Sequence, residues 1–496
     1  MPSISCPANS RRSRYPFGSS EPSPFATEPS RGARRQDPGR VLGCWLLAAL
    51  LLLGLPPVGL AAPPPWASKL GATGIGADSA NGIHPGVFCS SFTVAKRFGI
   101  QSLVWWTDAD SSSGSTVHEL QSQDLDRGGQ LAAPPAIEWT SPELASDARG
   151  RILLIDDGGD TLRRVGVAEL LDALSGETKV TVLDGASGGE VSTGFGNGFQ
   201  RRPELVLSPD GTQALLALDS TEDPDGLTAP SIVVIRVEAP AVPGGELVFS
   251  VPVRVNDFIG GNVSSVALGS FSYFFFLTDP GPVRGSTLTE RFVATWDSFG
   301  SPGDDDQLSS IQARLLDGTG APLATQFQVN TYTSGFQLAP DVATAADSSS
   351  FLIVWQSDGS PGDDSSLTSV QARGFDPTGV ALADQVQVNQ STSGFQYQPA
   401  VAALADGRYL VVWTDDPTTT TPRVMGRLLG ADGQPDGDEF QISVDPTSSE
   451  AEPDVATVGN DAVVVWKGGG IRVRSTFGSV FADDFESGDL SSWTIH

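Results

Sequence analysis

The chain has 496 residues with 30 basic and 59 acidic side chains, and its formal net charge at pH 7 is −29. An excess of negative charge of this size excludes nucleic acid and anionic membrane surfaces as partners, because both repel it. The three His and three Cys residues also argue against zinc sites and Ser/His/Asp or Cys/His catalytic groups, which need these side chains in clusters.

Residues 1–62 have the pattern of a secretory leader. Seven arginines precede an apolar run at about 44–55, and small residues follow from Gly59 to Ala62. This order is typical of a signal peptide, and the apolar run is too short for a membrane-spanning helix. Without these residues the chain keeps 23 basic and 56 acidic side chains, a net charge of −33. We expect a monomeric, secreted or cell-surface protein whose mature chain has no membrane span.

A repeated phrase organises the rest of the chain. Gly-Phe-Gln-x-x-Pro begins at Gly198, Gly335 and Gly394, and the last two copies lead into apolar runs that end in Trp355 and Trp413. A start of the form Pro-x-apolar, spaced by about 58 residues, extends the series. The predicted unit starts are Pro85, Pro142, Pro203, Gly261, Pro340, Pro399 and Pro453.

The unit at 340–389 shows what each repeat contains. It has four short β-type runs, each bounded by turn-forming Gly, Asp, Ser or Pro. We therefore predict an all-β chain with a single β-propeller over 63–480, built from seven four-stranded blades. The strand at 69–77 completes the last blade and covers its edge. Six or eight blades, or tandem β-sandwiches, are the alternatives, although a sandwich needs about 100 residues per domain.

Two segments depart from the repeat. The step between the fourth and fifth unit starts is long, which indicates an insertion around 279–290. The second unit contains Val167 to Leu174, whose apolar spacing predicts a short amphipathic helix.

Tryptophan recurs at the same position in the second β-type run of five units. The series could suggest a sugar-stacking surface, but a repeated position inside an apolar strand favours packing between blades. The residues are Trp106, Trp296, Trp355, Trp413 and Trp466.

Two acidic loops follow the Trp runs of neighbouring units and lie on one face of the predicted propeller. Calcium takes six to eight oxygen ligands, which Asp, Ser and backbone carbonyls of such loops can supply. The candidate calcium ligands are Asp297, Asp304, Asp305, Asp306, Asp358, Asp363 and Asp364. Neither loop has the spacing of an EF-hand, and a solvated turn is the alternative. No other cofactor and no catalytic residue is predicted.

The full pattern, Pro-x-Val-Ala, Val-Val-Trp, Gln-Ala-Arg, Asp-x-x-Gly and Phe-Gln-Val-Asn, resembles repeats of large secreted bacterial proteins. It matches well over 291–443 and is degenerate over 84–260. The tail at 481–496, with Phe-Glu-Ser-Gly-Asp-Leu-Ser-Ser-Trp, resembles a C-terminal ending of exported bacterial proteins. The resemblance implies propeller blades, export and surface sorting, and it implies no catalytic residues.

Two functions follow as hypotheses. The first is a secreted, non-enzymatic propeller that acts as a binding or cell-surface scaffold for an extracellular protein or glycan. The alternative is a polysaccharide hydrolase or lyase that uses carboxylates at one mouth of the propeller. Two carboxylates in a deep central pocket would favour the enzyme, and a shallow, evenly acidic face would favour the scaffold.

Overall fold

The computed structural model describes residues 73–74, 83–94, 97–110, 117–125, 136–141, 150–157, 162–171, 177–185, 189–191, 199–221, 224, 229–257, 262–275, 287–300, 303–305, 308–364, 367–418, 420–443 and 448–475. Every regular element in these residues is a β-strand, as the sequence predicts. The predicted signal peptide at 1–62 and the predicted sorting tail at 481–496 lie outside the described residues.

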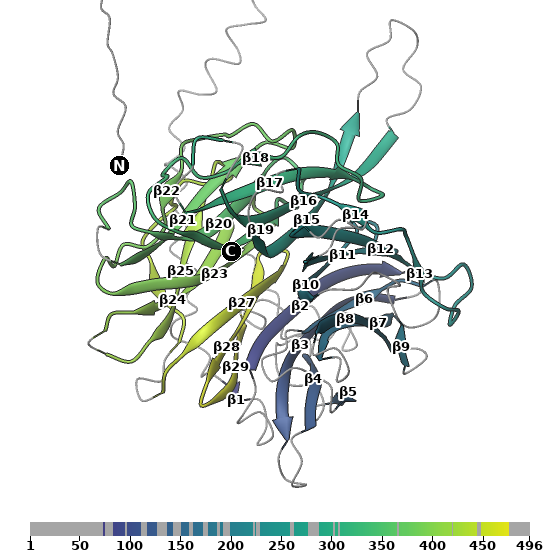
Figure 1. The fold of residues 1–496 in the computed structure, drawn as a ribbon. Coiled ribbons are helices and arrows are strands. Elements are labelled where there is room, and N and C mark those ends of the chain that lie inside the picture. Colours follow the sequence, from purple (N-terminus) through teal and green to yellow (C-terminus); the bar gives the residue numbers. More distant parts are fainter. Residues whose placement is uncertain are drawn as a thin grey trace, which may run out of the picture. The chain divides into compact units, whose positions relative to one another are not determined.

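The first four sheets are antiparallel, and strands that follow each other in sequence are neighbours in space (Figure 1). The first contains β2 (Ile83–Val94), β3 (Arg97–Asp110), β4 (Val117–Leu125) and β5 (Ala136–Ser141). The second contains β6 (Gly150–Ile155), β7 (Arg163–Leu171), β8 (Thr178–Asp184) and β9 (Gly189–Val191). The third contains β10 (Gln200–Leu207), β11 (Gln213–Ser220) and β12 (Ser231–Glu238), with β13 (Val248–Phe249) and β14 (Val253–Arg254) both paired to β12. The fourth contains β15 (Val263–Phe275), β16 (Thr287–Phe299), β17 (Ser309–Asp317) and β18 (Phe327–Gln328).

The next sheet has eight strands and consists of two antiparallel units. One unit contains β19 (Gln337–Thr344), β20 (Phe351–Asp358), β21 (Thr368–Phe375) and β22 (Val386–Gln387). The other contains β23 (Phe395–Ala403), β24 (Tyr409–Asp416), β25 (Arg423–Leu429) and β26 (Phe440–Gln441). A single parallel residue pair, Thr368 with Phe395, joins them.

The last sheet is completed by the N-terminal strand. It contains β27 (Ala451–Val458), β28 (Asp461–Gly468), β29 (Gly470–Ser475) and β1 (Thr73–Gly74). Thr73 pairs with Val473 and Gly74 pairs with Arg472, so β1 forms the fourth strand beside β29. An early segment of the chain therefore covers an edge that would otherwise offer unpaired backbone groups.

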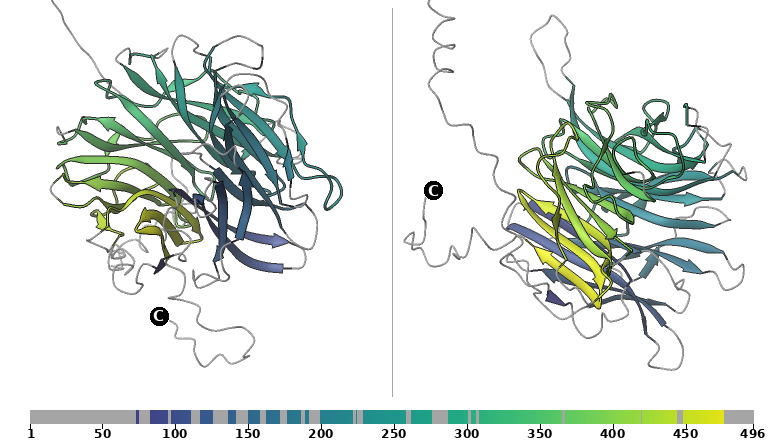
Figure 2. Two further views of the ribbon diagram at one scale, coloured as in Figure 1. Left: turned by 60° about the horizontal axis from the view of Figure 1, so that its bottom comes forward. Right: turned by 90° about the vertical axis from the view of Figure 1, so that its left-hand side faces the viewer.

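The sheets lie around a common centre (Figure 2), and the first strand of each unit faces a central cavity. This arrangement of four-stranded antiparallel sheets is that of a β-propeller. Division of the eight-stranded sheet at its single parallel pair leaves seven units in the described residues. Seven is the number that the sequence repeat predicts.

One prediction for the second unit is wrong. Val167 to Leu174 does not begin a helix, because Val167 and its neighbours belong to β7. This strand pairs with β6 on one side and β8 on the other. Burial of successive residues on both faces removes the alternation that identifies a strand in sequence. The predicted unit start at Pro142 lies outside the described residues, and the first described strand of the unit is β6.

The predicted insertion around 279–290 lengthens one hairpin. The strands β15 and β16 have 13 residues each and stay paired as far as Phe275 and Thr287. The repeat pattern of the fourth unit therefore continues past the insertion, and the core of the sheet keeps its register with β17.

The Pro of the repeated phrase lies in a β-bulge of the innermost strand. In β19 the register shifts between Leu338 and Asp341, and Ala339 has a positive φ of 48° just before Pro340. A bulge interrupts the ladder, so a residue that lacks an N–H costs no hydrogen bond there. Positive φ recurs at the same bulge position in five first strands, at Arg202, Ser265, Ala339, Gln398 and Glu452.

The Trp series packs between sheets, as predicted. Trp355 lies in a cluster with Val293 and Ile311 of the preceding unit, and Trp413 lies in a cluster with Val354 and Val370. Four of the five side chains are completely buried, namely Trp296, Trp355, Trp413 and Trp466. The side chain of Trp106 lies outside the described residues.

The Arg that ends the Gln-Ala-Arg motif, or stands at the equivalent position of the last two units, connects consecutive units. It occupies the third strand and donates from Nη1 to a backbone carbonyl at the end of the unit before it. The pairs are Arg314 with Val255, Arg373 with Val329, Arg427 with Val388, and Arg474 with Ile442. This recurrent polar residue within an apolar sheet thus has a structural role, because it satisfies backbone acceptors between sheets.

Candidate functional site

The first strands of all seven units line one central cavity of about 400 Å³. This volume lies in the range of cavities that bind small molecules or short segments of a polymer. The apolar part of the wall comes from residues such as Leu205, Leu268, Val342 and Val455. Charged groups are concentrated at a few positions close to the bulges.

The bulges place polar residues of the first strands on the cavity wall at two positions, before and after the Pro. The residues with positive φ, including Arg202 and Glu452, line the cavity directly. Two residues later, at the position after Pro, the wall carries Glu204, Asp341 and Asp454. The local disruption of the ladder therefore turns polar side chains of the strand toward the centre.

One side of the cavity holds an ion pair between neighbouring units. Nε of Arg151 in β6 donates to Oε2 of Glu204 in β10 at 3.0 Å. Burial lowers the pKa of Arg151, but the negative charges of Glu204, Asp454 and Asp341 together outweigh it and raise the pKa above its ordinary value. The guanidinium is therefore cationic and is surrounded by carboxyl groups.

Asp341 lies on the part of the cavity wall opposite the Arg151–Glu204 ion pair. Its Oδ2 accepts a hydrogen bond from the backbone N–H of Val401 in the next unit at 2.7 Å. Burial in the cavity wall raises the pKa of Asp341 to about 7, and the charges of Asp454 and Glu204 add to this shift. The carboxyl group is therefore partly protonated at neutral pH.

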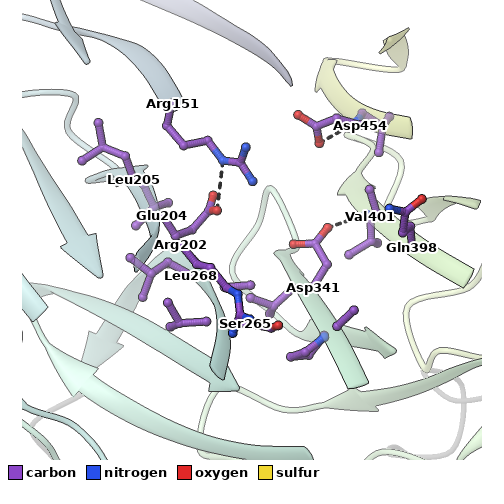
Figure 3. Close-up of a pocket in the computed structure, with 18 of the residues that line it drawn as sticks. Arg151, Arg202, Glu204, Leu205, Ser265, Leu268, Asp341, Gln398, Val401 and Asp454 are labelled. Atoms are coloured by element: carbon purple, nitrogen blue, oxygen red, sulfur yellow. Dashed lines mark hydrogen bonds and ion pairs between the residues drawn. The ribbon is translucent and has the colours of Figure 1, made fainter. Parts of the chain in front are cut away.

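Asp454 of the last sheet completes the set. Its Oδ1 accepts a hydrogen bond from the backbone N–H of Val455 at 2.9 Å. Figure 3 shows the side chains of Arg151, Glu204, Asp341 and Asp454 directed toward the same central space. Four different sheets supply these groups, so only the closed ring brings them together.

Trp105 adds an aromatic ring to the wall between the first and second units. The ring is 4% exposed, and its Nε1 donates to the carbonyl of Gly150 at 3.0 Å. This hydrogen bond satisfies the only polar atom of the indole and fixes the ring in place. Trp105 precedes the predicted packing residue Trp106 by one position and therefore lies on the other face of β3.

A second acidic group lies behind the wall. Asp219 and Asp297 occupy the ends of β11 and β16, and both side chains are almost completely buried. Burial raises the pKa of Asp219 to about 6, while the nearby Arg202 and Arg201 oppose the shift. Burial also raises the pKa of Asp297, which accepts a hydrogen bond from Ser264 at 2.6 Å.

The predicted calcium ligands divide between strands and loops. Asp297 and Asp358 belong to strands β16 and β20, whereas Asp306 lies outside the described residues. Oδ2 of Asp358 accepts a hydrogen bond from the backbone N–H of Phe336 at 3.2 Å. None of these lies on the wall of the central cavity.

The loop carboxylates bind amides of the Phe-Gln-Val-Asn motif. Asp363 accepts from Nε2 of Gln387 at 2.9 Å, and Asp364 accepts from Nδ2 of Asn389 at 2.8 Å. The preceding unit repeats the contacts, with Gln328 donating to Asp304 and Asn330 donating to Asp305. The motif therefore anchors each acidic loop to the outermost strand of its own sheet.

Metal binding at these loops stays a prediction. Within the described residues, no group of three or more His, Cys, Asp or Glu side chains is placed to hold a metal ion. The structure brings Asp304 close to Asp305, and Asp363 close to Asp364, but it leaves the two loops on separate sheets.

The sequence contained a signal for most of the cavity residues. Glu204, Asp341 and Asp454 are the middle residues of three Pro-x-apolar unit starts. The repeated phrase identified the connection between units. It did not predict the direction of the side chain after Pro, because that direction depends on the bulge. Arg151 had no such signal, because it does not belong to a Pro-x-apolar phrase.

No protein-family model matches the sequence, and no curated protein does. Among solved structures, the chain is similar to a protein of unknown function from Dyadobacter fermentans, with 11% identity, a TM-score of 0.43, and 82% and 98% of the two chains covered. It is also similar to an α-L-arabinanase from Penicillium chrysogenum, with 12% identity, a TM-score of 0.42, and 82% and 98% covered. An intramolecular trans-sialidase from Ruminococcus gnavus shows 10% identity, a TM-score of 0.40, and 80% and 95% coverage. With TM-scores this low, the assignment of the fold rests on the sheet topology and the central cavity.

Among the residues described, no helix is long and apolar enough to cross a membrane.

Proposed function

We propose that this protein cleaves glycosidic bonds with carboxyl groups of its central cavity. The observation that carries the proposal is the cavity wall, where Asp341 and Asp454 face one space and the pKa of Asp341 is raised to about 7. Glycoside hydrolysis needs a protonated and an ionised carboxyl group around one bond. Environments that separate the pKa values of neighbouring carboxyl groups provide this combination.

The roles follow from the surroundings of each group. Asp341 in its protonated form donates its proton to the glycosidic oxygen as the C–O bond breaks. The Asp454 carboxylate accepts a proton from the water that attacks the sugar carbon. Glu204 remains bound to Arg151 at 3.0 Å and keeps the negative charge that helps to raise the pKa of Asp341.

The test is release of reducing ends from a panel of soluble polysaccharides by residues 63–496. Asp341→Asn and Asp454→Asn each remove one reacting carboxyl group and should lower kcat by about a hundredfold or more. Glu246→Gln is the matched control, because it makes the same change at an exposed position. Absence of cleavage throughout the panel, or unchanged kcat in both cavity variants, would contradict the proposal.

The place of action follows from charge and from the leader pattern. We propose that the protein is exported and acts outside the cell as a monomer on a glycan. The net charge of −33 without residues 1–62 favours solubility there and disfavours anionic surfaces.

A second candidate function is a binding scaffold, and one surface favours it. Antiparallel pairing brings the start of the first strand, the end of the second and the start of the third to the same end of each unit. Large apolar side chains are exposed at this end in neighbouring units, namely Phe199, Phe299, Leu308, Leu367 and Phe395. Exposed apolar groups that form a continuous patch mark interaction surfaces. Binding of a glycan or protein without any turnover, lost in a Phe395→Ser variant, would select the scaffold.

A further inference from the structure

Two side chains on the wall of the central cavity have a buried polar atom without a hydrogen-bond partner among the described residues. The atoms are Nη1 of Arg202 in the third unit and Oε1 of Gln398 in the sixth. A buried polar group without a partner costs free energy, which a ligand can recover. The first atom belongs to a cationic donor and the second is an acceptor. A ligand with an anionic group and a hydroxyl group would therefore satisfy both.

We propose that Arg202 binds the anionic group of an acidic sugar, and that the glycan cleaved in this cavity carries carboxylates or sulfate esters. Gln398 accepts a hydrogen bond from a hydroxyl group of the same glycan. Figure 3 shows Arg202 and Gln398 on different sides of the central space, so a ligand that reaches both extends across it. This inference rests on the proposed carbohydrate function and specifies its substrate class.

The backbone positions Arg202 before any ligand binds. The residue has a positive φ of 51° in the bulge of β10, a conformation that residues with a side chain adopt at a cost. Its backbone N–H donates to Oε1 of Glu169, a buried residue of the second unit. The bulge and this contact between units fix the point at which the long side chain leaves the strand. Less freedom is then lost when an anion binds to the guanidinium.

Other charged groups of the wall have partners of their own. Glu204 accepts from Nε of Arg151 at 3.0 Å, and Oε1 of Glu452 lies 3.8 Å from Nζ of Lys467. These pairs offset positive and negative charge on the wall before a ligand enters. Arg202 differs from them, because its Nη1 keeps its capacity to donate to an anion. Hydrogen bonds between a guanidinium and an anionic oxygen are stronger than those between neutral groups.

Two carboxyl groups behind the wall do not take the place of the ligand. The charge of Arg202 acts on both Asp219 and Asp297, but neither bonds to its Nη1. Asp219 forms an ion pair with Arg201 at 3.4 Å. Asp297 accepts a hydrogen bond from Ser264 at 2.6 Å. Burial raises the pKa of both carboxyl groups, and this reduces the negative charge that they hold against Arg202.

An anionic sugar is compatible with the proton that the proposed reaction needs. Burial, together with the charges of Asp454 and Glu204, raises the pKa of Asp341 to about 7. A further negative charge in the cavity raises this pKa more and keeps Asp341 protonated. Asp454 belongs to the seventh unit, which lies across the ring from the third. The ligand anion at Arg202 and the carboxylate of Asp454 are therefore on different sides of the cavity.

The acidity of the whole chain does not prevent this binding. Salt screens exposed charges that lie farther apart than about 8 Å at physiological ionic strength. The affinity of a short sugar inside the cavity therefore depends on the groups that line it. An extended anionic surface, in contrast, meets the summed charge of the protein.

The experiment measures binding of tetrasaccharides to the protein by isothermal titration calorimetry at physiological ionic strength. Tetramers of galacturonate, glucuronate and mannuronate are each compared with their methyl esters, which keep the rings and lose the charge. A carrageenan tetrasaccharide is compared with its desulfated form. We expect at least one charged tetramer to bind about tenfold or more tightly than its neutral counterpart. The pair that shows this preference tells whether the anionic group is a carboxylate or a sulfate ester.

Variants of the two side chains locate the effect. Arg202→Gln removes the charge and should reduce the preference for the charged tetramer to less than about threefold. Arg202→Lys should keep part of the preference, because an ammonium group retains the charge without the planar fork of donors. Gln398→Leu should weaken binding of the charged and neutral tetramers by the same factor. Arg408→Gln is the control, because it makes the same change at a turn outside the cavity.

Three outcomes would overturn the inference: no binding of any charged tetramer, equal binding of each charged tetramer and its neutral counterpart, or a preference that Arg202→Gln leaves unchanged. Each is distinct from failure of the proposed function. Cleavage of a neutral glycan that depends on Asp341 would keep the enzyme and remove the preference for acidic sugars. Binding of a charged tetramer through Arg202 without cleavage would keep the preference and remove the enzyme.

Discussion

Nη1 of Arg427 donates to the backbone carbonyl of Val388 at 2.7 Å, and this contact ties the third strand of one unit to the end of the unit before it. Nε of the same side chain donates to the carbonyl of Gly437 at 2.9 Å. Burial lowers the pKa of Arg427, which shows that the surrounding sheets desolvate the charge. A charged residue of the repeat thus donates hydrogen bonds to backbone carbonyls between sheets.

Replacement of this residue should be costly. Arg427→Met leaves two backbone acceptors without their donor, and we expect a loss of about 2 kcal/mol in the free energy of unfolding. Arg408→Met is the control, because Arg408 pairs with Asp406 at a half-exposed turn and such pairs contribute less than about 1 kcal/mol. Denaturant titration of both variants measures the difference. Equal losses of unfolding free energy in the two variants would show that the inter-unit contact stabilises the protein no more than the surface ion pair does.

The Trp side chains differ in their hydrogen bonds, although their burial is the same. Nε1 of Trp355 donates to Oε1 of Gln337 at 2.9 Å. Nε1 of Trp413 has no hydrogen-bond partner among the described residues. Trp355→Phe should therefore destabilise the protein by about 1 kcal/mol more than Trp413→Phe. Chemical unfolding of the two variants under one condition tests this order, and the reverse order would contradict the assignment.

Stability should fall as pH rises toward neutrality. The pKa of Asp341 is about 7 in the folded protein against an ordinary value of 3.8, so the folded state binds more protons between these values. Unfolding free energy then decreases with pH across this window and is lowest above pH 7. Asp219, with a pKa of about 6, acts in the same direction.

The variant Asp341→Asn isolates this effect. It should raise the melting temperature relative to the wild type at pH 8 and have little effect at pH 4, where the carboxyl group is protonated in the folded state and only about half ionised in the unfolded state. Differential scanning calorimetry from pH 4 to 8 measures the difference. A variant that is less stable than the wild type at pH 8 would show that the Asp341 carboxylate is stabilising.

The calcium prediction for the acidic loops has a direct test. Calcium at the loops would share the Asp363 and Asp304 carboxylates with the amide groups of Gln387 and Gln328. A melting temperature that calcium raises and a chelator restores, in the wild type but not in Asp304→Asn/Asp363→Asn, would support the site. An unchanged melting temperature would remove it.

Much of the propeller can be predicted from the sequence, because each repeat unit is a continuous segment of the chain. Strands and turns follow from runs such as Phe351 to Trp355, since each unit repeats one pattern of apolar and turn-forming residues. The helix predicted from Val167 failed for a tertiary reason: β7 is covered by neighbouring sheets, and its sequence reflects this burial rather than helical spacing. Asp305 and Asp364 suggested metal ligands, although the amide groups of Asn330 and Asn389, from the same unit as each loop, bind them.

The sequence by itself determined an acidic, all-β repeat chain and the N-terminal strand that completes its last sheet. Periodicity and turn-forming residues are local properties of the sequence, so they can be recognised without knowledge of the closed ring. Only the tertiary structure placed Arg151, Glu204, Asp341 and Asp454 around one cavity. Glu204, Asp341 and Asp454 follow bulges of their strands, and the pKa values of Arg151 and Asp341 depend on burial and on charges from other sheets, which no single unit contains.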